Sequence, residues 1–74
     1  MRNRLCMFPN LKAEQARAHM TNQDVADVLK ITRVTYETKK KSGRFWVHEA
    51  KQLCNLFKCE FNYLFATLEE LDTA

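Results

Sequence analysis

The stretch TNQDVADVLKITRVTYETKKKSG, residues 21–43, decides the fold. Thr21 is a typical helix N-cap, and Asp24 three residues later forms a weaker version of the capping box. Val25 stands four residues after the cap, where it completes a hydrophobic staple with the apolar residue before the cap. These signals predict a helix that opens at Thr21 and runs to about Leu29. Its apolar face is expected to comprise Val25, Ala26, Val28 and Leu29.

The same combination of cap and staple follows at once. Ile31 precedes a second cap, Thr32, and Tyr36 stands four residues after that cap. A second helix is therefore predicted from Arg33 to about Lys40. Two short helices separated by only three residues are typical of a helix-turn-helix.

Another helix is predicted before this stretch. Pro9 favours an extended residue before it, and Asn10 is then the expected N-cap of a helix over residues 11–19. Phe8 is expected to fold back beneath this helix. The inward face is expected to comprise Leu11, Gln15 and Ala18.

Two more helices are predicted after Gly43, where the helical pattern breaks. One covers residues 47–57, and the other begins near Glu60. The apolar stripe of the former follows i, i+3, i+4 spacing and consists of Val47, Ala50, Leu53, Cys54 and Phe57. The stripe of the latter consists of Phe61, Leu64, Phe65 and Leu68, with Leu71 as an extension.

The size and composition agree with one small all-α domain. The chain has 74 residues, and its single Gly and single Pro are too few for an all-β fold with many tight turns. We expect a short basic arm at residues 1–9, a compact five-helix domain at residues 10–66 and an acidic tail at residues 67–74. Arg2 and Arg4 make the arm basic.

The charge distribution points to a polyanion as partner. Residues 30–58 hold eight basic side chains against two acidic ones, whereas the tail is acidic. The simpler interpretation is a solvated lysine face, and charge alone does not separate the two.

Several function classes are disfavoured by what the sequence lacks. The longest apolar run, residues 5–8, is far too short for a membrane span, so we expect a cytoplasmic, nucleoid-associated protein. Three cysteines without CxxC spacing and two distant histidines predict neither a disulfide framework nor a metal site. Ser42 is the only serine and no Gly-rich phosphate loop is present. We therefore expect no enzyme activity, no cofactor and no small-molecule ligand.

The ordered motifs resemble those of the Cro/lambda-repressor-like helix-turn-helix family of phage and bacterial regulators. The matching segments are TNQDVA at 21–26, LKITRVTY at 29–36, Gly43, EAKQL at 49–53 and FNYLF at 61–65. The resemblance implies a five-helix domain that inserts its third helix into the major groove of double-stranded DNA. It also implies a homodimer on a two-fold, operator-like site, as in a small Cro-like repressor.

The resemblance and the helix positions assign roles to individual residues. Base contacts are expected from the outward side of the third helix, at Arg33, Val34, Glu37 and Thr38. Phosphate contacts are expected from helix starts and from the basic residues after the third helix: Asn22, Gln23, Thr32, Lys39, Lys40, Lys41 and Arg44. The dimer contact is expected from Leu64, Leu68 and Leu71. For each cation the alternative is an ordinary solvated side chain.

Tyr36, Trp46 and the phenylalanines are expected in the core, with Trp46 either packed on the turn or exposed at an interface.

Three features depart from the family pattern, at four positions. Lys30 and Lys58 occupy turn positions where relatives often have Gly. Gln15 and Lys40 stand where many relatives pair an Arg with a Glu, so the ion pair that braces the third helix is predicted to be absent.

Two functions remain open on the sequence. The first is a sequence-specific DNA-binding regulator. The second is a protein-interaction module of the same fold, such as an antitoxin or an anti-repressor partner, which the acidic tail and the apolar last helix would also suit.

Overall fold

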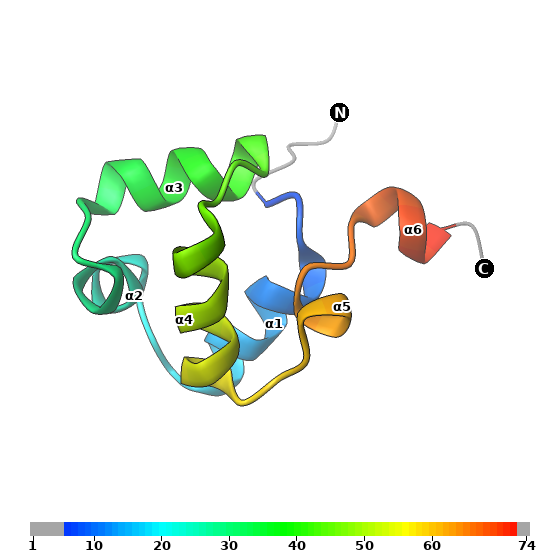
Figure 1. The fold of residues 1–74 in the computed structure, drawn as a ribbon, viewed down its shortest axis with the longest axis horizontal. Helices are drawn as coiled ribbons and strands as arrows, with labels where there is room; N and C mark the ends of the chain where they lie inside the picture. Colours follow the sequence, from blue (N-terminus) through cyan, green and yellow to red (C-terminus); the bar gives the residue numbers. More distant parts are fainter. Residues whose placement is uncertain (1–5, 73–74) are drawn as a thin grey trace.

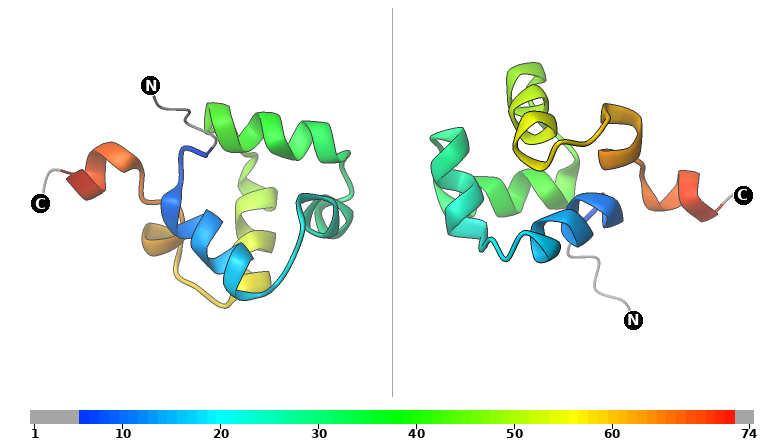
Figure 2. Two further views of the ribbon diagram at one scale, coloured as in Figure 1. Left: turned by 180° about the vertical axis from the view of Figure 1, so that it is seen from behind. Right: turned by 90° about the horizontal axis from the view of Figure 1, so that it is seen from below.

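The computed structural model describes residues 6–72. All regular structure in that range is helical, which confirms the all-α prediction. The helices are α1 (Pro9–Arg17), α2 (Asn22–Leu29), α3 (Arg33–Ser42), α4 (Val47–Phe57), α5 (Phe61–Leu64) and α6 (Leu68–Asp72). In Figure 1, α3 lies along one edge, α4 runs from the end of α3 through the middle, and α6 projects from the body. The two further views in Figure 2 also show α6 apart from the other helices.

The core forms where the helices cross. Its residues are Cys6, Phe8, Leu11, Val25, Ala26, Leu29, Tyr36, Ala50, Leu53, Leu64 and Phe65. Phe8 stacks edge-on against Phe65, with ring centroids 5.1 Å apart, and Phe45 lies 5.7 Å from Phe65 and 6.2 Å from Tyr36. In a domain of this size such aromatic contacts supply much of the apolar burial that holds the chain together.

The predicted caps of α2 and α3 are confirmed. Asp24 N donates to Thr21 Oγ1 at 3.0 Å, and Thr21 N donates to Asp24 Oδ2 at 2.9 Å, which closes the capping box. Thr32 Oγ1 accepts from Thr35 N at 3.1 Å. The bounds of α4 are also as predicted, and α3 continues to Ser42 because Gly43 takes up the left-handed conformation that ends it.

The start of the chain differs from the prediction. α1 begins at Pro9, whose fixed φ and missing N–H suit the first helical position, and Phe8 occupies the N-cap. Asn10 is therefore not a cap, and its Nδ2 donates to the Tyr63 carbonyl at 2.9 Å. Cys6 and Phe8 are buried, so residues 6–8 belong to the packed domain rather than to an arm. Arg2 and Arg4 lie outside the described residues.

The predicted fifth helix is divided in two. α5 ends at Leu64, and α6 opens after Thr67 with a capping box of its own. Thr67 N donates to Glu70 Oε1 at 2.9 Å, and Glu70 N donates to Thr67 Oγ1 at 3.2 Å. A cap at Thr67 requires an extended backbone, which is incompatible with one continuous helix from residue 60. The described residues thus contain six helices where five were predicted.

Several apolar side chains assigned to helix faces are exposed. Val47, the first residue of α4, is 74% exposed. Val28, Ala18 and Phe61 are also exposed, although the Phe61 ring lies 5.0 Å from that of Phe65. Cys54 and Phe57 are half-buried at the edge of the core.

Three turns use a left-handed residue other than Gly. Lys30 and Lys58 have φ values of 61° and 54°, and His19 has a φ of 58°. Each turn is closed by a backbone hydrogen bond across six residues, such as Ile31 N to Ala26 O at 3.0 Å. Left-handed backbone costs a residue with a side chain about 1 kcal/mol.

No helix in the described part of the chain has the length and apolar character to cross a membrane.

Candidate nucleic-acid interface

The unit formed by α2, its turn and α3 positions the candidate site. Ala26 is fully buried, and its carbonyl accepts the hydrogen bond from Ile31 N that closes the turn. Val25 and Tyr36 are fully buried on the two helices. In Figure 1, α2 is viewed nearly end-on while α3 is seen along its length, so the two helices cross steeply. The burial of Tyr36 turns the opposite side of α3 to solvent.

The solvent side of α3 carries three of the four predicted base-contacting residues. Arg33, Val34 and Thr38 are exposed, and Val34 is 61% exposed. Thr35 is exposed beside them, and its Oγ1 accepts from Thr32 Oγ1 at 2.8 Å. Thr35 was not singled out from the sequence, although its spacing of three from Thr38 places it near the same face. This surface offers a cation, a methyl-bearing side chain and hydroxyl groups on one helix.

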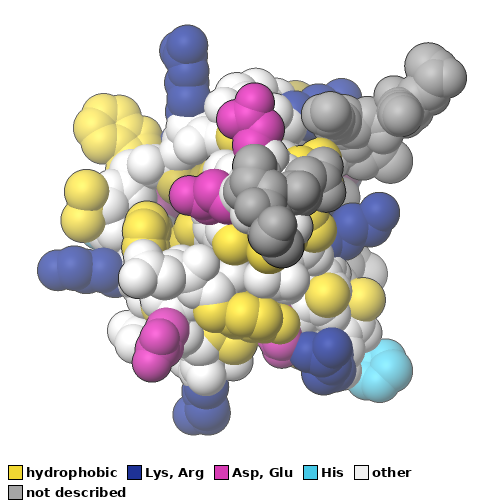
Figure 3. Space-filling view, turned by 90° about the vertical axis from the view of Figure 1, so that its right-hand side faces the viewer, with side chains coloured by type: hydrophobic (Ala, Val, Ile, Leu, Met, Phe, Trp, Pro, Cys, Tyr) yellow, Lys and Arg dark blue, Asp and Glu magenta, His cyan; other side chains and the backbone are white. Residues whose placement is uncertain are grey.

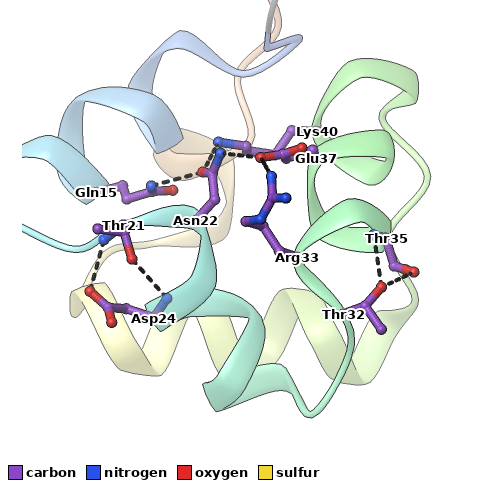
Figure 4. A network of polar contacts seen from close by, with 9 residues as sticks. All are labelled: Gln15, Thr21, Asn22, Asp24, Thr32, Arg33, Thr35, Glu37 and Lys40. Atoms are coloured by element: carbon purple, nitrogen blue, oxygen red, sulfur yellow. Dashed lines mark hydrogen bonds and ion pairs between the residues drawn. The ribbon is translucent and has the colours of Figure 1, made fainter.

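Glu37, the fourth of these residues, is held by neighbours. Its Oε2 accepts from Arg33 Nη1 at 2.9 Å and from Asn22 Nδ2 at 3.0 Å. The Asn22 hydrogen bond, followed by the Arg33 hydrogen bond, lowers the pKa of the Glu37 carboxyl. The acceptor that was expected to face a base is therefore already occupied by an amide from α2 and by the neighbouring guanidinium (Figure 4).

A polar network joins α1, α2 and α3 behind this surface. Asn22 Oδ1 accepts from Lys40 Nζ at 2.7 Å and from Gln15 Nε2 at 3.0 Å (Figure 4). Gln15 Oε1 accepts in turn from the buried Tyr36 hydroxyl at 2.8 Å. Gln15 and Lys40 brace α3 without an ion pair between them, because Asn22 bridges the two side chains.

Two of the lysines that were expected to contact phosphate are held by residues of their own chain, one buried and one half-buried. Lys40 is 7% exposed, and its Nζ lies 4.7 Å from the centroid of the Tyr36 ring. Lys39 forms an ion pair with the buried Glu49 at 3.1 Å. Their phosphate contacts stay predictions, and in the structure each ammonium is engaged by residues of its own chain. Among the other expected phosphate contacts, Asn22 is half-buried in the network, whereas the exposed ones are Gln23, Thr32, Lys41 and Arg44.

Glu49 was not identified from the sequence. Its Oε1 accepts both from Lys39 Nζ and from Trp46 N, at 2.9 Å for the latter, so it ties the end of α3 to the start of α4. Its position at the third residue of α4 is the capping-box position, which was the available signal. Trp46 is 66% exposed and lies 5.9 Å from Lys39 Nζ, so it is not a core residue.

The three leucines expected at a dimer contact do not share one environment. Leu64 is fully buried and presents no surface to a second copy, because α5 packs its side chain into the core. Leu68 is half-buried, and Leu71 is exposed on α6.

The described residues hold no group of three His, Cys, Asp or Glu side chains placed to bind a metal ion. Comparisons with models of protein families, with curated proteins and with solved structures found no match.

Proposed function

We propose that this protein is a sequence-specific double-stranded DNA-binding regulator of the Cro/lambda-repressor-like type, in which α2 and α3 form the helix-turn-helix. The observation that carries the proposal is the two-sided character of α3. Tyr36 and Lys40 fix one side within the domain, while Arg33, Val34 and Thr38 are exposed on the other. A helix anchored in this way fits the width of the major groove.

Base reading is assigned to the exposed side of α3. Arg33 is suited to a bidentate contact with the guanine edge, worth about 1–3 kcal/mol of discrimination. Val34 is suited to a thymine methyl group, and Thr38 to either kind of base. Glu37 acts with Arg33 rather than alone, since the ion pair between them orients the guanidinium.

Phosphate contacts are assigned to the exposed residues at the margins of α3. Lys41 and Arg44 follow the helix, and Thr32 and Gln23 stand at helix starts. With Lys39 and Lys40 engaged internally, two cations per protomer remain in this set. For a dimer we expect a log–log salt slope of about −4, from roughly 0.9 per neutralised phosphate. Such a regulator would act by occupying a promoter as a dimer.

The test is a selection of duplexes from a randomised library, followed by NMR titration with the selected duplex. We expect shifts to cluster at residues 32–38 and 41–44. Arg33→Ala should remove the preference for one base and leave the melting temperature nearly unchanged, because an exposed ion pair contributes little stability. The control is Lys51→Gln, which removes an exposed cation from α4. Enrichment of no sequence, or equal effects of both variants, would refute the proposal.

A protein-interaction module is the second candidate, and an apolar hollow between α4 and α5 favours it. The hollow has a volume of about 630 Å³ and is lined by Phe45, Val47, Ala50, Lys51, Cys54, Asn55 and Phe61. Val47 and Phe61 are both exposed at it. On the side from which α6 projects, Figure 3 shows hydrophobic side chains at the surface among basic and acidic ones. A module of this kind should bind duplex DNA weakly or not at all, which separates the two candidates.

A further inference from the structure

The ammonium of Lys40 is a buried cation without a carboxylate partner. Its Nζ donates to the neutral Asn22 Oδ1 and faces the Tyr36 ring, and no ion pair to Lys40 occurs in residues 6–72. Buried charges in proteins are normally paired, because desolvating an isolated ion costs several kcal/mol. Lys40 therefore has no ion-paired carboxylate among the described residues, and its nearest counter-charge is the Glu37 carboxylate, which raises its pKa less than burial lowers it.

A solvent-accessible hollow lies beside this ammonium. It has a volume of about 480 Å³ and is lined by Cys6, Lys12, Gln15, Ala16, Met20, Asn22, Glu37, Lys40 and Lys41. Lys12 and Lys41 are exposed and form no ion pair within the described range. Lysines from α1 and α3 thus converge on one hollow. The proximity of Lys12 contributes, after burial, to lowering the pKa of Lys40.

The one carboxylate at the hollow, Glu37, offsets the charge of its three lysines only in part. Glu37 is bound by Arg33, so the pair is neutral as a unit. Asn22 and Gln15 add amide groups to the lining, and these are already hydrogen-bonded to each other and to Lys40. The hollow therefore carries an excess of positive charge, supplied by three ammonium groups.

We propose that this hollow is a binding site for a phosphate group, held by Lys12 and Lys41 at its rim and by the field of Lys40 at its base. A tetrahedral oxyanion suits this site, because its oxygens can accept from ammonium groups that approach from different directions. Its volume exceeds the roughly 30 Å³ that one water takes up in the liquid, so an oxyanion fits with its remaining water. The site departs from the expectation that the protein takes no small ligand. It does not rest on base reading by α3.

The experiment is a titration of the full chain with inorganic phosphate, followed by amide NMR at constant ionic strength set with chloride. We expect saturable shifts at residues 12–16, 22 and 37–41. Lys12→Gln and Lys41→Gln should each raise the dissociation constant about tenfold, the typical effect of losing one charged hydrogen bond. Both positions are exposed, so the variants should fold. Lys51→Gln, an exposed lysine on α4, is the matched control and should bind phosphate as the unaltered chain does.

The proposal is overturned if the shifts do not saturate, if chloride reproduces them, or if Lys51→Gln weakens binding as much as Lys12→Gln. A second titration, with duplex DNA in the presence of phosphate, identifies the source of the group. Competition, together with uniformly weaker duplex binding by Lys12→Gln, assigns the hollow to the DNA backbone. Independent binding of both assigns it to a free phosphate compound. Phosphate binding without any duplex binding would refute the proposed function and leave this site standing.

Discussion

Lys40 Nζ donates a hydrogen bond of 2.7 Å to Asn22 Oδ1, and this contact joins the last turn of α3 to the first residue of α2. The same Asn22 donates through Nδ2 to Glu37. One amide therefore holds α3 at two successive turns. The orientation of the exposed side of α3 depends on a residue that does not belong to that helix.

Asn22→Ala should lower the free energy of unfolding by about 1–3 kcal/mol, because it leaves the buried Lys40 ammonium without its oxygen acceptor. Urea denaturation measures the change. Asn55→Ala removes an exposed amide from α4 and serves as the control, with an expected change within about 0.5 kcal/mol. Equal stability of the two variants would contradict the bridging role of Asn22.

Ala26→Leu should destabilise the domain by about 1–3 kcal/mol, because the site is fully buried beside the turn and has no room for a larger side chain. Thermal unfolding measures the loss. Ala13→Leu places the same side chain on the exposed surface of α1 and should be nearly neutral. If Ala26→Leu melts like Ala13→Leu, the crossing of α2 and α3 is not as close as described.

Lys58→Gly should stabilise the protein by up to about 1 kcal/mol, because φ at this position is 54° and Gly adopts such values without a steric penalty. Lys51→Gly is the matched control in the interior of α4, where the same replacement should cost about 1 kcal/mol. Chemical denaturation of both variants measures whether each replacement raises or lowers the free energy of unfolding. A loss of stability in Lys58→Gly would mean that its side chain contributes more than the backbone strain costs.

The Glu37 carboxyl should titrate below its ordinary pKa of 4.5, because Asn22 and Arg33 hydrogen-bond to its charged form. A folded-state pKa below the unfolded value stabilises the protein above the unfolded pKa, and the contribution disappears as the pH falls through the folded pKa. Carboxyl NMR measures the midpoint. Arg33→Gln should move the midpoint upward, whereas Lys51→Gln should leave it in place. A midpoint at 4.5 in the unaltered chain would disprove the contact.

The sequence predicted what depends on local chemistry. The capping box at Thr21 and the cap at Thr32 act within one helical turn, so spacing alone identifies them. The bounds of α4 were likewise predictable, because its apolar stripe follows the i, i+3, i+4 spacing of a helix. The left-handed residues at Lys30 and Lys58 stand at turn positions where the sequence motifs led us to expect Gly.

The sequence did not predict which polar groups find partners across helices. Lys39, Lys40 and Lys41 are consecutive and have the same chemistry. Lys39 and Lys40 nevertheless bind residues of the same chain, whereas Lys41 is exposed. Their fates depend on Glu49 and Asn22, which approach only after α4 and α2 have packed. Likewise, the break at Thr67 depends on competition between a local cap and a continuing apolar stripe, which spacing alone does not decide.

The join between Tyr36 and Gln15 is made by a hydroxyl and an amide, neither of which carries a charge. Salt ions screen the charge of an exposed lysine, but they have little effect on this hydrogen bond, because the Tyr36 hydroxyl is buried. A rising salt concentration should therefore lower the affinity for a polyanion well before it lowers the stability of the fold. If the protein binds DNA as proposed, a rise in salt concentration should dissociate the complex without unfolding the domain.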